Sequence, residues 1–214
     1  LADFAWLPPD PAARSRIAAL PREAPAAWEE GRRIAATRLD ALAIGALDRA
    51  VARRIAVPPA GVPRLRLALL GTATMGHLHA GLRVAALRRG IWLDIHENDF
   101  GQYRQELENP NSGLHRFRPE AVILALDARH ATGGLAPHDE AAAALAHDEA
   151  TIAQLRRCWA LARDTLRCAV IQQAILPVFP SLLGQNEHRL PGSPAAAVAR
   201  LNARLRAAAG DEGV

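Results

Sequence analysis

The sequence is poor in several residue types that mark particular classes of protein. It contains no lysine, so its 26 basic residues are all arginine, and the Gly-Lys-Ser/Thr ending of a phosphate-binding P-loop is excluded. Its two cysteines, Cys158 and Cys168, exclude a disulfide framework and a four-cysteine zinc site, and we expect both to be small buried side chains. No apolar run is long enough to span a membrane and no signal-peptide pattern is present, so the expected location is the cytoplasm, with no membrane partner.

Aromatic residues are also scarce, at 4% of the chain, which leaves little surface for stacking nucleic-acid bases. The net charge of +4 is modest, and no arginine-rich block with interleaved aromatics occurs, so we expect no nucleic-acid partner. Half of the residues are apolar, which is enough to build a core. Because the sequence lacks an initiator methionine, we expect it to be part of a longer gene product.

The first 63 residues differ in pattern from the rest. Residues 1–27 contain five prolines and are expected to form an extended arm or short turns. From Trp28 to Ile55 there is no proline and apolar residues recur at helical spacing, which predicts one or two amphipathic helices with Gly45 as the candidate break. A linker with three prolines follows. We therefore expect an N-terminal helical arm over residues 1–63 and a separate domain over residues 64–214.

The second part alternates between short apolar runs and helical patterns. This alternation predicts βαβ units, a parallel sheet and right-handed crossovers. The run AVILAL is apolar throughout, as expected for a parallel strand that is covered on both faces. The predicted fold is a three-layer α/β/α domain with a parallel sheet. The expected strands are 65–70, 91–95, 121–126 and 168–175, and the expected helices are 76–89, a short one within 98–107, 139–167 and 195–209.

Ligands of open parallel sheets bind outside the carboxyl ends of the strands, which selects the loops that follow the four strands. In the first loop, Gly71, Thr72 and Thr74 predict either an anion cradle of backbone N–H groups or a tight turn that needs small residues. In the third loop, Asp127 and Arg129 either hold a carboxylate or phosphate of a ligand or pair with each other to shape the loop.

The densest polar cluster follows the fourth predicted strand, over residues 184–189. Asn186 and His188 belong to it, and the cluster predicts either a binding loop or a solvated loop. No metal site is predicted, because side chains two apart on a helix, such as His77 and His79, cannot share one ion. No serine follows a predicted strand as a nucleophile does in hydrolases, and no DxDxT phosphatase motif occurs.

Three stretches of the sequence carry a resemblance to a known family. They are RLALLGTATMGHLHAGLRVAALRRGI, ENDFGQYRQELENPNSGLHRFRPEAVILALDARH and QQAILPVFPSLLGQNEHRLPGSPAAAVARLNARL. A fourth stretch, the helical segment ATRLDALAIGALDRAVAR, fits the region that precedes the conserved domain of that family. Together the four stretches cover roughly residues 28–210, and NDFGQYRQE and NEHRLPGS are the most specific phrases. The sequence thereby resembles the N-terminal domain of FkbH-like proteins.

The resemblance implies a role in glyceryl transfer. FkbH-like proteins carry a C-terminal phosphatase-like domain of the haloacid dehalogenase (HAD) superfamily, which takes a glyceryl group from 1,3-bisphosphoglycerate and loads it onto an acyl carrier protein for polyketide-type biosynthesis. That chemistry uses a nucleophilic aspartate in DxDxT and Mg²⁺, and the motif is absent from this sequence. The resemblance therefore implies an accessory domain without a cofactor of its own, which binds the carrier protein or a 1,3-bisphosphoglycerate-type small molecule.

This accessory domain is similar in fold to SGNH hydrolases, which implies a flavodoxin-like strand order. The resemblance also places the SGNH motifs on numbered residues. The GDS block falls on Gly71-Thr72-Ala73, so an alanine stands at the nucleophile position, while the glycine of the second block is retained as Gly101. The GxND block falls on residues 127–130, where Arg129 replaces the oxyanion asparagine, and the final DxxH block and the fifth strand would lie beyond residue 214.

Two rival functions remain at this stage. One is an SGNH-type esterase or acyltransferase that uses Thr72 or Thr74 as nucleophile, with a base from His188 or from the absent C-terminal part. The other is a non-catalytic assembly module, in which the helices of residues 28–55 pack against a partner.

Overall fold

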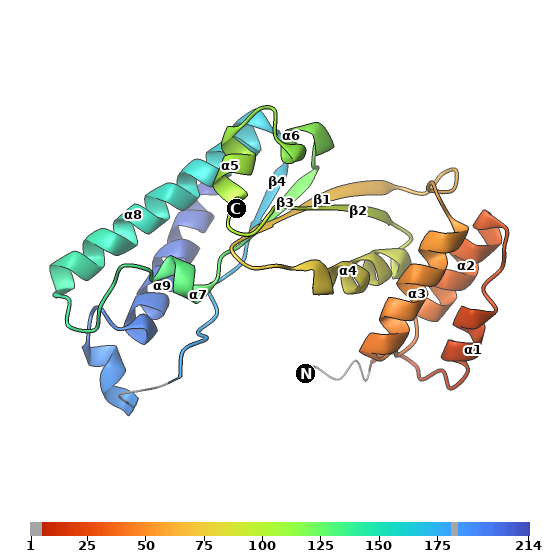
Figure 1. Cartoon of the computed structure of the whole chain (residues 1–214), viewed down its shortest axis with the longest axis horizontal. Coiled ribbons are helices and arrows are strands. Elements are labelled where there is room, and N and C mark those ends of the chain that lie inside the picture. Colours follow the sequence, from red (N-terminus) through yellow and green to blue (C-terminus); the bar gives the residue numbers. More distant parts are fainter. Residues whose placement is uncertain (1–5, 181–183) are drawn as a thin grey trace. The chain divides into compact units, whose positions relative to one another are not determined.

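The chain is an α/β protein in which four short strands alternate with helices (Figure 1). The computed structural model describes residues 6–180 and 184–214. The helices are α1 (Ala13–Ala18), α2 (Ala24–Ala35), α3 (Ala41–Arg54), α4 (Gly76–Arg88), α5 (Tyr103–Glu108), α6 (Gly113–Phe117), α7 (Ala128–Ala131), α8 (Ala141–Ala160) with the π-helical turn η1 (Leu161–Thr165), the 3₁₀ helix η2 (Gly184–Arg189) and α9 (Pro194–Glu212). The strands are β1 (Arg64–Gly71), β2 (Trp92–Glu97), β3 (Ala121–Ala125) and β4 (Ala169–Gln172).

The residues form two compact units. The first contains the residues up to Arg66 together with Met75–Ile95, and the second contains Leu67–Thr74 together with His96–Val214. The division into domains at residues 63 and 64 remains a prediction. No helix in the described ranges is both long enough and apolar enough to cross a membrane.

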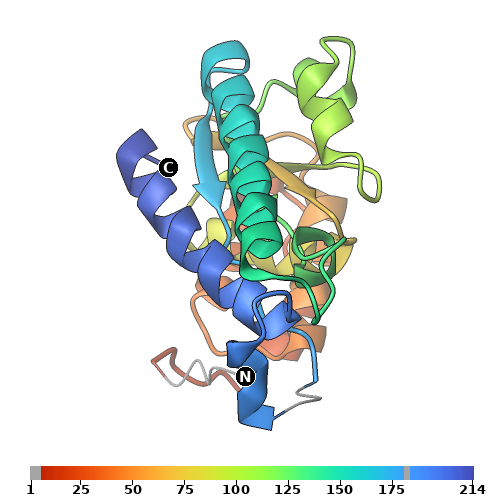
Figure 2. The ribbon, with the colours of Figure 1, turned by 90° about the vertical axis from the view of Figure 1, so that its left-hand side faces the viewer.

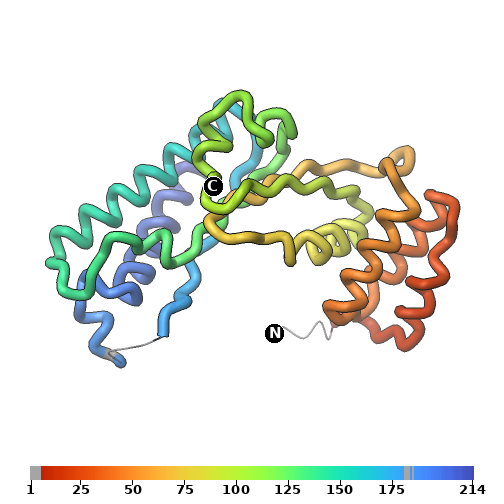
Figure 3. Tube along the Cα trace, in the orientation of Figure 1, coloured from red at the N-terminus to blue at the C-terminus, as the bar shows by residue number. Residues whose placement is uncertain are grey.

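The first unit is a packed group of helices. Helices α2, α3 and α4 contact one another, and their traces run close together in Figure 3. Ile34 and Leu47 are fully buried in the apolar core of this unit. A Cβ added to Gly31 would lie 3.2 Å from a methyl carbon of Val51, so glycine lets α2 approach α3 closely. Helix α3 begins after Asp40, whose carboxylate accepts the Ala43 N–H at 2.7 Å and caps the helix.

One sheet contains all four strands, in the order β2-β1-β3-β4. The β1–β3 and β3–β4 pairs are parallel, with Gly71 opposite Ala125 at the ends of β1 and β3. This order matches the first four strands of the flavodoxin-like order, so the predicted fold class is confirmed. Parallel neighbours require crossover connections, and the helical segments between the strands supply them.

Helices α8 and α9 pack side by side in the second unit (Figure 2). Val122 and Leu124 of β3 are fully buried in one cluster with Leu155 and Trp159 of α8. The neighbouring residues of β3 are only half-buried, and Ile171 of β4 is 52% exposed. The residues of β3 that face away from α8 are thus covered less completely than those that face it, and none of the residues of this strand is exposed.

Several boundaries differ from the sequence-based expectations. Residues 1–27 are not merely an arm with turns, since α1 and the start of α2 lie there. The break between the next two helices falls at residues 36–40, where Asp40 caps α3, and Gly45 lies inside that helix. Strand β4 covers only four residues of the predicted 168–175, and the short α7 forms within the predicted loop after β3.

Candidate functional site

The carboxyl ends of β1 and β3 lie next to each other, and a threonine and an aspartate join them. The Thr72 hydroxyl donates to Asp127 Oδ2 at 2.8 Å and accepts the Asp127 N–H at 2.9 Å. Thr72 is buried, with 4% of its surface exposed. Because both hydrogen bonds use the same oxygen, this hydroxyl holds the two loops together.

Asp127 also begins α7. Its Oδ1 accepts the His130 N–H at 2.9 Å, which caps this single helical turn. Burial raises the pKa of the Asp127 carboxyl, but the hydrogen bonds from the His130 N–H, the Thr72 hydroxyl and the Arg129 N–H outweigh burial, and the pKa lies below its usual 3.8. A carboxylate with a lowered pKa is ionised at neutral pH and is a weak base toward the Thr72 proton.

A buried asparagine fixes the end of β1 from the other side. Asn98 Oδ1 accepts the Gly71 N–H at 2.7 Å, and Asn98 Nδ2 donates to the Gly71 carbonyl at 3.1 Å. The same amide nitrogen donates to the Asp99 carbonyl at 2.5 Å. Sequence reasoning missed Asn98; its place in the loop after the second predicted strand, in the stretch END, was the available signal.

Three polar side chains form a chain of hydrogen bonds beside Asp127. Gln154 Nε2 of α8 donates to the Tyr103 hydroxyl at 2.6 Å, and that hydroxyl lies 3.2 Å from His130 Nε2. Tyr103 is fully buried, so its hydroxyl needs these partners. Burial lowers the pKa of His130 below 6.5, although the charge of Asp127 acts in the opposite direction. The arrangement is satisfied when neutral His130 accepts the Tyr103 proton at Nε2.

A pocket of about 270 Å³ adjoins this chain of hydrogen bonds. Tyr103 and Arg104 of α5, His130 of α7, and His147 and Gln154 of α8 supply its polar lining. His147 Nε2 lies 2.9 Å from the Ala131 carbonyl oxygen, which fixes the orientation of that ring. The pocket combines one guanidinium with neutral donors and acceptors, a lining that suits a small molecule bearing an anionic group and hydroxyls.

The structure brings together some of the residues that the sequence nominated. Gly71, Thr72 and Asp127 form one network, as described above. Thr74 is exposed, and Gly101 occupies a turn with a φ of +71°.

The other nominated residues lie apart from this network. The guanidinium of Arg129 lies 5.7 Å from the ring centre of Phe179, and the described ion pairs do not include one between Arg129 and Asp127. Asn186 and His188 are exposed on η2. Their roles, and that of Thr74, remain predictions.

The predicted anion cradle in the first loop loses two of its donors. The Gly71 N–H is bound to Asn98, and the Thr72 N–H is directed at the Ala125 carbonyl at 3.4 Å. Both interpretations of this loop, the anion cradle and the tight turn that needs small residues, remain predictions.

The described residues contain no group of three His, Cys, Asp or Glu side chains able to hold a metal ion. The expectation that this part of the protein has no cofactor of its own, with magnesium in the catalytic domain, remains a prediction. Cys158 and Cys168 are free and buried, and burial raises the pKa of the Cys158 thiol to about 11, so neither is a ready metal ligand.

Comparison with known families decides the classification. The family model for the FkbH N-terminal domain matches residues 66–212. The chain belongs to this family. The resemblance seen in the sequence is therefore confirmed. The comparison with curated proteins gives no match.

One solved structure is similar in fold. It is the N-terminal part of a Bacteroides fragilis protein, which contains a phosphatase domain and was crystallised as a complex with Mg. The TM-score is 0.59 and the sequence identity is 14% over 86% of this chain. The chain covers 42% of the length of that structure, so the likeness concerns the fold of part of the larger protein.

Proposed function

We propose that this chain is the accessory N-terminal domain of an FkbH-like protein that transfers a glyceryl or phosphoglyceryl group from a 1,3-bisphosphoglycerate-type donor to an acyl carrier protein in polyketide-type biosynthesis. Within that protein, the chain binds the phosphorylated three-carbon substrate. The family match over residues 66–212 supports the parent activity, and the polar pocket lined by Arg104 and His130 supports the binding role.

The chemistry of the pocket fits such a substrate. A phosphorylated glycerate offers anionic oxygens to Arg104 and its one hydroxyl group to His130 or Gln154, which all line the pocket. A volume of about 270 Å³ is nearly twice that of the 150 Å³ cavity that holds benzene, so a molecule of roughly ten non-hydrogen atoms fits, which is the size of a glycerate with a single phosphate.

The site supports binding better than hydrolysis. Ala73, at the position of the SGNH nucleophile, has no hydroxyl, and the Thr72 hydroxyl donates a hydrogen bond to an ionised carboxylate that is a weak base. The esterase alternative then depends on exposed Thr74, for which no hydrogen-bonded base is found within the described residues. The phosphatase chemistry and its Mg²⁺ belong, in this proposal, to a separate domain with the DxDxT motif.

The carrier protein is the proposed macromolecular partner, and the cytoplasm is the proposed location, since both the carrier protein and the charged donor are water-soluble. The assembly-module alternative differs in one respect. It predicts that deleting the helices of residues 28–55 abolishes oligomerisation without changing the binding of small molecules.

Calorimetric titration with 3-phosphoglycerate, a stable analogue of the donor, tests the binding role. We expect binding to the intact chain, and a loss of about tenfold or more in affinity in Arg104→Ala and in His130→Ala, the factor expected from one hydrogen bond to a charged group. Arg206→Ala is the matched control, because Arg206 is exposed on α9 and outside the pocket. A parallel titration with acyl carrier protein tests the partner. If neither ligand binds, both roles are refuted.

A further inference from the structure

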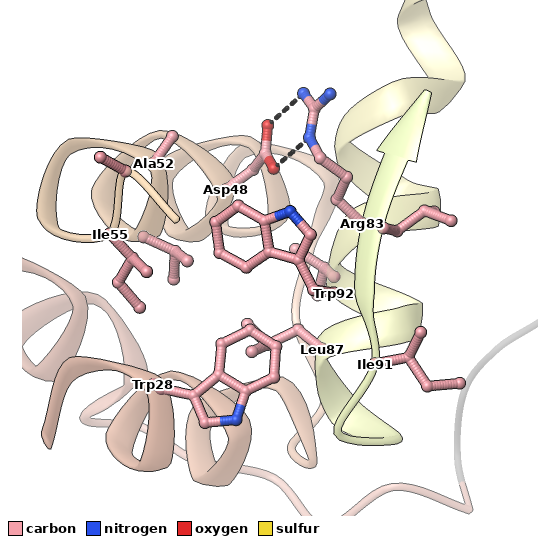
Figure 4. A pocket seen from close by; sticks show the side chains of 12 residues that line it. Trp28, Asp48, Ala52, Ile55, Arg83, Leu87, Ile91 and Trp92 are labelled. Atoms are coloured by element: carbon pink, nitrogen blue, oxygen red, sulfur yellow. Dashed lines mark hydrogen bonds and ion pairs between the residues drawn. The ribbon is translucent and has the colours of Figure 1, made fainter. Parts of the chain in front are cut away.

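The first unit contains a second pocket that the proposed function does not use. Helices α2, α3 and α4 and the start of β2 enclose about 290 Å³ (Figure 4). All of its lining residues belong to the first unit. Its walls are mainly apolar, and they include Ile55, which follows the last residue of α3, and Leu87 of α4.

Two indoles form one wall of this pocket. The ring centres of Trp28 and Trp92 are 6.0 Å apart and the planes are tilted by 32°. At this separation no further ring can enter between them, so a ligand contacts their outer surfaces, across from Ala52 and Ile55 in Figure 4. Aromatic rings pack well against such surfaces in offset or edge-to-face geometry.

One end of the pocket is polar and electrically balanced. Arg83 of α4 donates from Nε to Asp48 Oδ1 and from Nη2 to Asp48 Oδ2, each at 2.7 Å (Figure 4). These two residues are the charged members of the lining. Each carboxylate oxygen retains lone pairs and the guanidinium retains N–H groups beyond the two bonds, while the pair carries no net charge.

This combination selects a ligand type. A carboxylate at the polar end would be repelled by Asp48, and an ammonium group would be repelled by Arg83. In each case the member of opposite charge is already paired within the ion pair. A neutral amide or alcohol can both donate to the carboxylate and accept from the guanidinium. The volume is about twice that of a cavity that holds benzene, which corresponds to roughly ten to twelve non-hydrogen atoms.

We propose that the first unit binds a neutral aryl-alkyl amide or alcohol, with the aromatic ring against Trp28 and Trp92 and the polar group at the Asp48–Arg83 pair. This site is separate in residues and in ligand class from the pocket at His130.

Two probes of equal size and different charge test the proposal on the full chain. They are 3-phenylpropanamide and 3-phenylpropanoate, and affinity is measured by calorimetry and by the change in tryptophan fluorescence. We expect the amide to bind about tenfold tighter than the carboxylate, the factor expected from one hydrogen bond to a charged group. In Asp48→Asn the positive charge of Arg83 is no longer balanced, so the preference inverts and the carboxylate binds tighter.

A second pair of variants separates pocket binding from surface binding. Ala52 is exposed and lines the pocket, so Ala52→Phe fills the space and abolishes binding of the amide. Ala41→Phe adds the same ring on the same helix outside the pocket and leaves binding unchanged. Absence of amide binding, equal affinity for the two probes, an unchanged preference in Asp48→Asn, or binding that survives Ala52→Phe each overturns the proposal.

Discussion

The link between Thr72 and Asp127 makes a measurable contribution to stability. Valine has the shape of threonine, so Thr72→Val removes the hydroxyl with little change in packing. The variant loses a hydrogen bond to an ionised carboxylate, worth about 1.5–3 kcal/mol, and leaves the Asp127 N–H without its partner, worth about 1 kcal/mol more. We expect the free energy of unfolding to fall by about 3 kcal/mol, measured by urea denaturation at neutral pH.

A second threonine provides the control. Thr132 is 6% exposed, and its hydroxyl donates at 2.8 Å to the uncharged Ala128 carbonyl. Thr132→Val therefore loses one neutral hydrogen bond, worth about 1 kcal/mol, at any pH.

The dependence on pH distinguishes the two variants. The pKa of Asp127 lies below 3.8 in the folded chain, so stabilisation by its ionised form is present above pH 3.8 and is lost as the pH falls through the folded value. Thr72 contributes to that lowering, so the difference between wild type and Thr72→Val shrinks in acid, while the difference for Thr132→Val stays constant. Equal losses in the two variants at neutral and acidic pH would refute the reasoning.

Three further outcomes test the packing of the second unit. A Cβ at Gly192 would lie 1.9 Å from a backbone carbonyl oxygen, so Gly192→Ala lowers the free energy of unfolding by about 3 kcal/mol. Gly210 lies on α9 with open space around it, so Gly210→Ala raises the free energy of unfolding by about 0.5 kcal/mol. Thermal denaturation measures both changes. Asp148 is fully buried in an ion pair with α9, so Asp148→Asn costs about 3–5 kcal/mol, while Glu149→Gln at an exposed pair costs less than about 1 kcal/mol. Burial raises the pKa of the Cys158 thiol to about 11, so Ellman's reagent reacts with it rapidly only after urea is added, and rapid reaction in the native chain would contradict its burial.

The elements that the sequence predicts well are those whose pattern depends on local chemistry. The apolar run at residues 121–126 contains β3, and the helix from Gly76 stops before Gly90, whose φ of +72° favours glycine. The start of α9 follows from Ser193, whose side chain accepts the Ala196 N–H at 3.2 Å.

The elements that the sequence predicts poorly depend on contacts between distant segments. Helix α1 is short and lies in a proline-rich stretch, where its core contact through Ile17 outweighs the turn signals. Strand β4 ends at Gln172, and the last backbone bond to β3 runs from the Gln173 N–H to the Leu124 carbonyl at 2.9 Å. The Gln172 side chain accepts the indole N–H of Trp159, a contact between distant segments that no local pattern marks.

The candidate site shows the same division. Thr72 and Asp127 could be named as candidate site residues because each follows a predicted strand. In the structure these two residues are hydrogen-bonded to each other. Tyr103 and Gln154 are 51 residues apart in the sequence, and nothing local marks their hydrogen bond. The pairing of α5 with α8 creates that contact, so only the folded chain reveals it.

The amide of Asn98 ties the loop after β2 to the end of β1. A side chain bonds to both the N–H and the carbonyl of Gly71, as the backbone of one more strand residue would. The main chain after Asn98 therefore leaves the sheet while both backbone groups of Gly71 stay paired. The loop from Asp99 to Gln102 can thus change its conformation without leaving a buried polar group at the end of β1 unsatisfied.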